Sequence, residues 1–232
     1  SAASDVYKRQ DREIFGEYCF PGEPVHKEKI TFQDLLEYEN VDFQGFRGDI
    51  YVKEAIIPEG ASVIPKSQFF GCRSLEKVCL PESVSVIEDY AFADCNVLKV
   101  WESMEKLSLK SVGISAFENC YALEFISLPD SLTVIEGAAF ADCVSVNKLI
   151  FSDTSLLNKI GDHAFRGCRN LKEVYLPDSV EYVGISAFRD CVSLEQISVS
   201  EKIKDQPGIA ELEKNCPNAR IRFREVNSVE KE

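Results

Sequence analysis

The pair Phe-x-x-Cys recurs through most of this 232-residue chain at a nearly constant interval, and this repeat constrains the fold more than any other feature. The steps between successive cysteines of the pair are 23, 25, 23, 25 and 23 residues. A period in this range is typical of a solenoid, in which each unit packs only on its neighbours. The six complete copies are Phe69/Cys72, Phe92/Cys95, Phe117/Cys120, Phe140/Cys143, Phe165/Cys168 and Phe188/Cys191.

Two degenerate copies flank this series. The earlier one has Phe46 followed by Asp49 in the cysteine position, 23 residues before the first repeat cysteine. The later one has Glu213 in the Phe position and ends at Cys216, 25 residues after the last complete copy. We therefore expect residues 46–223 to form a solenoid of about eight units, the last of which acts as a C-terminal cap.

Apolar residues occupy fixed positions on both sides of the pair. Such columns are expected because each apolar side chain stacks on its equivalent in the next unit, and one unit cannot bury this face alone. The position five residues before Phe holds Ile64, Ile87, Val112, Ile135, Ile160 and Val183. The position six residues after Cys holds Val78, Trp101, Ile126, Leu149, Val174 and Ile197, and Ser103 interrupts a third column two residues further on.

The segment after each cysteine alternates in the manner of a strand. Val174-Tyr175-Leu176 shows the period of two that predicts a short strand. Proline follows this segment in four units and ends the strand, because it has no N–H for the ladder. Strands that return in the same direction every 23–25 residues predict a parallel sheet. The small residues before each Phe, such as Ser115-Ala116, predict one helical turn on the opposite face.

Six of the nine cysteines share one repeat position, with Phe three residues before and mostly Leu three residues after. This regular apolar setting predicts a ladder of buried thiols, which behave as small hydrophobic side chains. Adjacent rungs could lie close enough for disulfides, so spacing alone leaves both states open, and the pattern favours free thiols. The spacing fits no paired zinc motif. The redox states of Cys19, Cys79 and Cys216 do not follow from the sequence.

The two ends of the chain differ from the repeat region. Residues 1–10 resemble the translation of a sequencing adapter, which would leave the true N-terminus missing, and a short native tail is the alternative. Residues 11–45 are expected to form an N-terminal cap or the remnant of a truncated upstream region. A helix start at Thr31 favours the cap, whereas apolar positions in residues 38–45 favour a worn repeat. Residues 224–232 form a polar tail.

The last unit combines a helix with a charged strand. Residues 208–215 are expected to be helical after Pro207. Residues 220–224 alternate charged and apolar side chains, so Ile221 and Phe223 are predicted to point inward and the three arginines outward. A charged edge strand discourages further strand addition.

The repeat pattern Leu-Pro-x-x-Val-x-x-Ile-x-x-x-Ala-Phe-x-x-Cys-x-x-Leu-x-x-Ile resembles the BspA-like class of leucine-rich repeats. Residues 132–155 and 157–180 carry it nearly intact, and the resemblance covers residues 46–223. It implies an α/β-type leucine-rich-repeat solenoid, with a curved parallel sheet on the concave face and short helical turns and loops on the convex face. It also implies a cell-surface or secreted protein that binds host proteins or other cells.

Charge and hydropathy exclude two classes of partner. The net charge of −13 opposes binding to nucleic acid, because phosphates attract lysine and arginine. The sequence contains no run of 18 apolar residues, so no membrane insertion is expected. We expect a monomer that binds a protein ligand.

No motif in the sequence predicts catalysis. The two histidines are His26, in a Pro/Gly loop, and His163, in a varied position that reads as an outward turn. The chain lacks a phosphate loop, a zinc-protease motif and a nucleophile elbow, so no catalytic residue, metal or cofactor is expected.

The outward side of the predicted sheet is the candidate binding surface. Residues five and seven positions after each cysteine should point away from the core, on a face about 30 Å long. Val100, Phe125, Ile150 and Tyr175 could form one apolar strip across it, which favours partner binding. The alternative is ordinary strand composition, since exposed strands also favour such residues. The expected rim residues are Lys77, Lys148, Lys172, Glu173 and Glu195.

Cys79 is the only repeat-region cysteine at an outward strand position, where it is either a reactive thiol or simply a small strand residue. The sequence as a whole predicts a non-catalytic protein-binding module that acts in adhesion. The alternative is a structural spacer or the recognition arm of a larger protein whose functional domain lies upstream.

Overall fold

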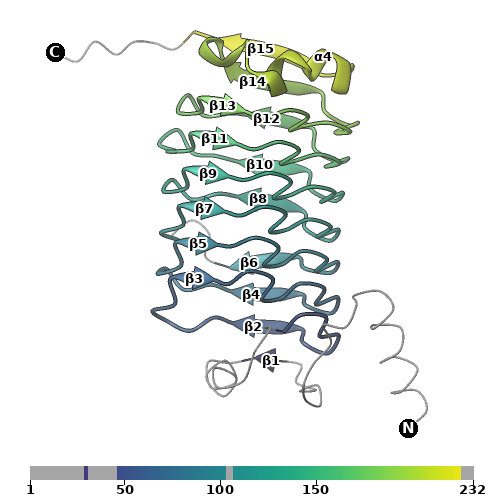
Figure 1. The fold of residues 1–232 in the computed structure, drawn as a ribbon. Helices are drawn as coiled ribbons and strands as arrows, with labels where there is room; N and C mark the ends of the chain where they lie inside the picture. Colours follow the sequence, from purple (N-terminus) through teal and green to yellow (C-terminus); the bar gives the residue numbers. More distant parts are fainter. Residues whose placement is uncertain (1–28, 31–45, 103–106, 226–232) are drawn as a thin grey trace, which may run out of the picture.

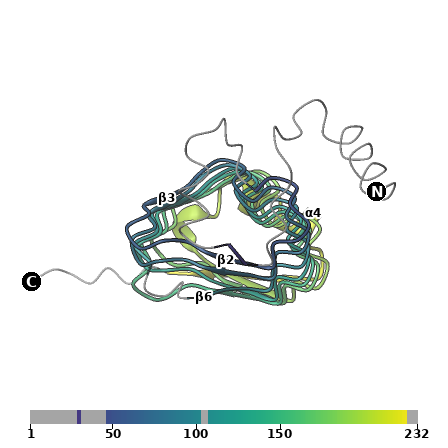
Figure 2. The ribbon, with the colours of Figure 1, turned by 90° about the horizontal axis from the view of Figure 1, so that it is seen from below.

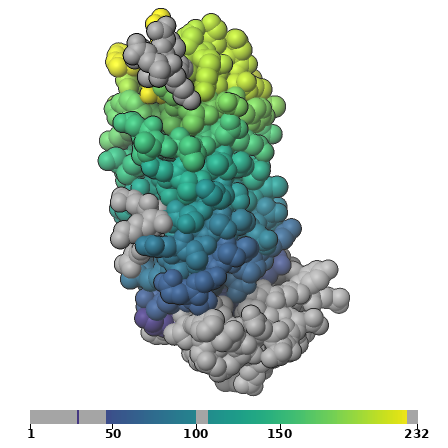
Figure 3. All heavy atoms as spheres, turned by 90° about the vertical axis from the view of Figure 1, so that its left-hand side faces the viewer, coloured from purple at the N-terminus to yellow at the C-terminus, as the bar shows by residue number. Residues whose placement is uncertain are grey.

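The computed structural model describes residues 29–30, 46–102 and 107–225, which form a stack of coils (Figure 1). Each full coil contributes one strand to each of two faces. Figure 2, which looks along the stack, shows the coils lying nearly on top of one another around one shared interior. The side view in Figure 3 shows the coils following one another as a continuous column from the N-terminal to the C-terminal end. The predicted parallel-strand solenoid is confirmed.

The first face carries the longer strands, which occupy the predicted positions after each cysteine. Every pairing among them is parallel. They form two sheets, with strand orders β1-β2-β4-β6 and β8-β10-β12-β14-β15, and no pairing among the described residues joins β6 to β8. The strands are β1 (Lys29–Ile30), β2 (Glu54–Ile56), β4 (Lys77–Cys79), β6 (Val100–Glu102), β8 (Phe125–Ser127), β10 (Lys148–Ile150), β12 (Glu173–Tyr175), β14 (Gln196–Ser200) and β15 (Arg220–Arg224).

The second face carries a six-stranded parallel sheet that the sequence did not predict. Each strand has two residues, of which the second is the buried member of the apolar column before Phe. The strands are β3 (Val63–Ile64), β5 (Val86–Ile87), β7 (Ser111–Val112), β9 (Val134–Ile135), β11 (Lys159–Ile160) and β13 (Tyr182–Val183). The coil is therefore held to its neighbours by backbone hydrogen bonds on two faces.

The phenylalanines of the repeat form one continuous stack through the core. Successive rings from Phe46 to Phe188 have centroids between 5.1 and 5.7 Å apart and planes within 16° of parallel. The six phenylalanines after Phe46 are at most 1% exposed. Offset stacked rings add stabilisation to the burial of the aromatic surface itself. The repeat period therefore fixes the core directly, because it places one ring per coil in the same position.

The segment around each Phe is a tight turn rather than the predicted single helical turn, so that prediction is wrong. Backbone φ is positive two residues before Phe, as at Tyr90 (58°), and two residues after it, as at Asp94 (60°). The N–H of Phe92 donates to the carbonyl of Ala116 in the next coil, at 2.8 Å, and the other coils repeat this bond. These N–H groups bond between coils, so they are not available for an intrahelical ladder.

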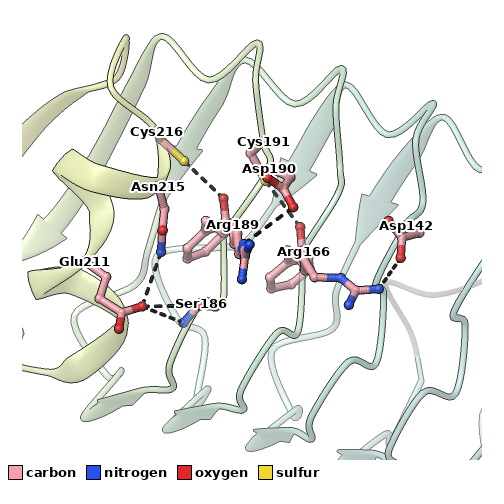
Figure 4. A network of polar contacts seen from close by, with 11 residues as sticks. Asp142, Arg166, Ser186, Arg189, Asp190, Cys191, Glu211, Asn215 and Cys216 are labelled. Atoms are coloured by element: carbon pink, nitrogen blue, oxygen red, sulfur yellow. Dashed lines mark hydrogen bonds and ion pairs between the residues drawn. The ribbon is translucent and has the colours of Figure 1, made fainter.

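The repeat cysteines are buried and free of disulfides. Each thiol donates a hydrogen bond to the carbonyl oxygen of the Phe one coil earlier. The Sγ–O distance is 2.8 Å from Cys72 to Phe46 and 3.4 Å from Cys168 to Phe140, and the other thiols fall between these values. Cys216 of the last unit makes the same bond to Phe188, which Figure 4 shows.

The C-terminal unit contains short helices, as predicted for residues 208–215, and its role as a cap stays a prediction. The helices are the 3-10 helix η2 (Glu201–Ile203) and the α-helices α3 (Pro207–Ala210) and α4 (Leu212–Asn215). Their apolar residues Ile203, Ile209 and Leu212 are at most 3% exposed. Phe223 of β15, however, is 45% exposed, so the prediction that it points into the core is wrong. Its neighbour Val199 is buried, but no further described coil covers Phe223.

At the other end, β1 extends the first face by one strand. Lys29 is the register partner of Glu54, and the Lys29 ammonium lies 3.1 Å from the Glu54 carboxylate. The helix start expected at Thr31 and the worn repeat expected in residues 38–45 lie outside the described residues.

Glycine is required where two turns of the second face touch. A Cβ added at Gly161 would lie 2.6 Å from the backbone nitrogen of Gly137, and backbone cannot move aside without separating the coils. We expect Gly161→Ala to lower the free energy of unfolding by about 1–3 kcal/mol. Urea denaturation measures this loss. Gly137→Ala is the matched control, because its nearest contact would be 3.3 Å, and an equal loss in both variants would contradict the explanation.

Candidate functional site

The candidate face is the outward side of the strands β2, β4, β6, β8, β10, β12, β14 and β15. Alternation along β2, β4, β8, β10 and β12 buries the middle residue and turns the first and third residues outward, as in β8, where Ile126 is buried between two residues that are not. In β14 the third residue, Ser198, is buried as well. The two sheets present these outward residues in register, because all strands are parallel and repeat at the same position of the coil. A partner would therefore meet a regular surface of aligned side chains.

The predicted apolar residues of the C-terminal sheet lie on this face. Phe125 is 43% exposed and Tyr175 is 50% exposed, while Ile150 is half-buried. Lys148 pairs in register with both Phe125 and Glu173, so its exposed side chain lies between an aromatic ring and a carboxylate. The structure thus brings Phe125, Ile150 and Tyr175 onto three successive strands.

Val100 stands apart from these residues in the strand order. Its strand β6 pairs with β4, where Val100 is in register with Lys77, and belongs to the N-terminal sheet. Phe125 begins the C-terminal sheet on β8. No described pairing links the two strands, and the position of the Val100 side chain lies outside what the structure describes. A continuous strip from Val100 to Phe125 therefore stays a prediction.

Polar contacts hold the Tyr175 ring in place. The hydroxyl accepts a hydrogen bond from the Gln196 amide at 3.0 Å and donates to the Glu173 carboxylate at 3.4 Å. A half-exposed aromatic ring that is already positioned loses little side-chain entropy when a partner covers it. Tyrosine with this combination of apolar area and polar anchoring is typical of binding hot spots.

Three of the predicted rim residues lie on the coils of β12 and β14, near Tyr175. Lys172, Glu173 and Glu195 are exposed, and the Glu195 N–H donates to the Lys172 carbonyl at 2.8 Å, which places them on adjacent coils. Lys77 lies on β4 of the N-terminal sheet and is half-buried. Cys79 on the same strand is also partly exposed, in contrast to the buried ladder thiols.

The structure adds two basic residues to the C-terminal end of the candidate face, and the sequence did not predict them there. Arg220 and Arg222 are exposed on β15, in register with Gln196 and Ser198. The sequence identified the alternation of this strand, but it gave no sign that β15 continues the candidate face beside Tyr175. Arg220 lies four residues after Cys216, whereas its register partner Gln196 lies five residues after Cys191, so the spacing of the repeat did not identify Arg220 as the equivalent position.

His163 does not point outward, so that prediction is wrong. It is half-buried, its N–H donates to the Ile185 carbonyl at 2.9 Å, and its Nδ1 atom is buried without a hydrogen-bond partner. Ser186 at the same repeat position is 8% exposed and bonds to Glu211 of the next coil, as Figure 4 shows. The position is buried because the turn brings it against the following coil. His26 lies outside the described residues.

Among the described residues, the shifted pKa values belong to the ladder thiols and to side chains in hydrogen bonds or ion pairs near the surface. Burial raises the pKa of each ladder thiol, as at Cys120. Hydrogen bonds from Ser152 and Thr154 lower the pKa of Asp130, and these bonds close the loop of a longer coil. Within residues 29–30, 46–102 and 107–225, no group of three or more His, Cys, Asp or Glu side chains could hold a metal ion. In the same ranges, no helix is long and apolar enough to span a membrane.

Comparison with known proteins places these features in a family. The family described as the BspA type leucine-rich repeat region matches residues 13–147 and 103–208, with six copies. The chain belongs to the BspA-type leucine-rich repeat family. Members of this family, and proteins of this fold, are generally non-enzymatic. A comparison with curated proteins found no match.

Solved structures similar to this BspA-type protein come from bacteria. A leucine-rich repeat protein from Bacteroides ovatus is 22% identical over 79% of this chain and 63% of its own, with a TM-score of 0.54. The pneumococcal vaccine antigen PcpA is 26% identical over 65% of this chain and 41% of its own, with a TM-score of 0.55. The chain thus spans less than two thirds of the length of either protein.

Proposed function

We propose that this BspA-type protein is a non-catalytic binding module that recognises a protein partner across its candidate face. Phe125, Ile150 and Tyr175 supply the apolar centre of the contact. The peripheral contacts come from Val100, Lys77, Lys148, Lys172, Glu173 and Glu195. The observation that carries the proposal is the half-exposed Tyr175 ring, which Gln196 and Glu173 hold in position. A second exposed ring, that of Phe125, lies on the same face two strands away.

The setting that we propose is the cell surface or the extracellular space, where the module contributes to adhesion to a host or neighbouring cell. The resemblance to BspA-like repeats supports this setting, as does the similarity to a pneumococcal vaccine antigen. The partner would be a host matrix or cell-surface protein, bound by a monomer.

Two substitutions on the candidate face test this proposal. Phe125→Asp and Tyr175→Ala are each expected to weaken partner binding by about tenfold or more, because central aromatic residues dominate the binding energy of such surfaces. The measurement is surface plasmon resonance against a panel of purified host matrix and cell-surface proteins, using residues 11–232. Circular dichroism and urea denaturation verify that each variant remains folded.

Tyr121→Ala is the matched control, since Tyr121 is 44% exposed but follows Cys120 in the turn and lies off the candidate face. It is expected to bind as the unsubstituted protein does. Unchanged affinity of both face variants for a bound partner would place the site elsewhere. Failure of the folded protein to bind any member of the panel would favour the structural spacer or recognition arm over the adhesion module.

A further inference from the structure

Basic side chains in the body of the solenoid pair with carboxylates one coil away. The Lys99 ammonium lies 3.1 Å from Glu76, that of Lys159 lies 2.8 Å from Glu136, and Arg166 pairs with Asp142, as Figure 4 shows. The partners are separated by 23 or 24 residues, which is one turn of the solenoid. The repeat thus gives many cations a partner on a neighbouring coil.

Arg220 and Arg222 on β15 have no such partner among the described residues, as is also true of exposed turn cations such as Arg73 and Arg169. Arg220 and Arg222 are exposed, and within the described residues neither forms an ion pair or a side-chain hydrogen bond. Their register partners on β14 are the neutral Gln196 and Ser198, and the positions on the other side of β15 hold no described strand. Arg224 on the same strand differs, because it pairs with Asp178 at 3.0 Å and also donates to the Leu176 carbonyl.

The edge of β15 has the properties of an acceptor for one more strand. With five residues, β15 matches β14 as the longest strand of the described chain, and it pairs with β14 along its whole length. It is the last strand in the order of its sheet, so one edge of its backbone has no described partner. Between the arginines of the strand, Phe223 is 45% exposed and Ile221 is half-buried, which leaves apolar surface for a neighbouring strand to cover.

We propose that β15 binds an extended acidic segment of a protein partner by strand addition. Carboxylates at alternate positions of the segment would lie beside Arg220 and Arg222, and the intervening apolar residues would cover Phe223. Main-chain hydrogen bonds supply affinity in this binding mode, and alternate side chains supply specificity. The proposal does not depend on the aromatic centre of the candidate face, because it uses the edge of the sheet and the two unpaired arginines.

The charge of β15 favours an acidic segment over a second copy of the chain as the bound strand. Two β15 edges brought together would place arginines of both copies side by side, and like charges across a strand pair are destabilising. An acidic segment instead neutralises them. The chain carries a net charge of −13, so an acidic peptide is repelled at long range and binds only where a local basic surface receives it.

A labelled peptide tests the proposal. The probe is fluorescein-labelled Gly-Ser-Glu-Ile-Glu-Val-Glu-Ile-Ser-Gly, and its binding to residues 11–232 is followed by fluorescence anisotropy. The control peptide, Gly-Ser-Glu-Glu-Glu-Ile-Val-Ile-Ser-Gly, has the same composition and charge but lacks the alternation. We expect the alternating peptide to bind more tightly than the control peptide. Hydrogen–deuterium exchange of the amides in residues 220–224 should slow when the alternating peptide binds.

Arg220→Ser combined with Arg222→Ser is expected to weaken binding of the alternating peptide by about tenfold, the upper range for two exposed ion pairs. Arg73→Ser combined with Arg169→Ser makes the same change in net charge at exposed turn positions and should leave binding within about twofold.

Several outcomes would overturn the proposal. These are failure of the alternating peptide to bind, equal binding of the control peptide, equal loss in both double variants, or binding without protection of the β15 amides. Dimerisation that the β15 double variant abolishes, measured by sedimentation velocity, would identify a second copy as the occupant. Phe125→Asp and Tyr175→Ala should bind the peptide normally, so this site and the proposed adhesion site can fail independently.

Discussion

Raising the pH from about 8 to about 10.5 is expected to unfold this protein steeply, because the thiol ladder must stay protonated in the folded state. Burial raises the pKa of every thiol in the ladder above the ordinary value of 9.0, to about 11 for Cys216 and well above the ordinary value for the others. In the unfolded chain, the same thiols titrate near their ordinary value.

The sign of the effect follows from these two states. Below about pH 9, both states keep their thiol protons and the stability is fully present. Above it, the unfolded chain releases protons that the folded chain retains, so the free energy of unfolding falls by about 1.4 kcal/mol per pH unit for each thiol. The ladder comprises Cys72, Cys95, Cys120, Cys143, Cys168, Cys191 and Cys216. Together, the seven thiols lower the free energy of unfolding by about 10 kcal/mol per pH unit, which is comparable to the whole stability of a typical domain.

The measurement is the urea midpoint as a function of pH under reducing conditions, with a serine variant as the control. In Cys143→Ser, the hydroxyl can still donate to the Phe117 carbonyl, which Cys143 reaches at 3.1 Å, but it does not titrate in this range. The variant should therefore release about one proton fewer on unfolding at alkaline pH. A pH dependence equal to that of the unsubstituted protein would show that the ladder thiols do not cause the alkaline unfolding.

Phe117→Ala is expected to lower the free energy of unfolding by about 3–5 kcal/mol, the usual cost of removing a buried aromatic ring. The Phe117 side chain is fully buried in the middle of the stack. Its ring centroid lies 5.1 Å from that of Phe92 and 5.2 Å from that of Phe140, so the substitution removes two stacking contacts at once. Each coil packs only on its neighbours, and a cavity of this size cannot be filled from elsewhere.

Phe125→Ala provides the comparison, because Phe125 belongs to the same coil but is 43% exposed on the candidate face. Phe125→Ala should lower the free energy of unfolding by less than about 1 kcal/mol, since part of the Phe125 ring is already in contact with water in the folded protein. Guanidinium denaturation of both variants measures the difference. Similar losses would mean that the stacked core contributes no more to stability than the exposed surface.

The core could be predicted because the period of the sequence acts on every coil alike. A Phe or Cys that returns every 23 or 25 residues must stack on its own copies, and the rings and thiols do so from Phe46 to Cys216. The three-residue strands were also predictable, because alternation around a buried residue such as Val174 extends over several positions.

The second sheet and the turns could not be predicted for physical reasons. Two-residue strands such as Val86–Ile87 are too short to show a period of two, although the apolar column containing Ile87 was evident. The turns depend on positive φ at residues such as Tyr90 and Ser115, which have no strong preference for that conformation. Hydrogen bonds to the next coil impose it, and a single sequence does not reveal such bonds.

The sequence predicted the outward direction of individual residues of the candidate site, but not the contacts between them. Strand alternation placed Phe125 and Tyr175 outward, and the structure leaves both about half exposed. Nothing in the sequence indicates that Gln196 holds the Tyr175 hydroxyl, because that contact depends on the register between coils. Among the described residues no pairing joins β6 to β8, and the only departure that the sequence shows near this point is Ser103, a polar residue in an apolar column.

The equivalence of the bonds between coils has a consequence for how such a protein can evolve. Phe117 donates to Ala139 and Phe140 donates to Ala164, so each coil offers the next one the same surface. Recombination between repeats within the gene can therefore remove or duplicate a whole coil and rejoin matching surfaces. The length of the solenoid, and therefore the length of each of its faces, can change during evolution by one coil at a time while the fold is preserved.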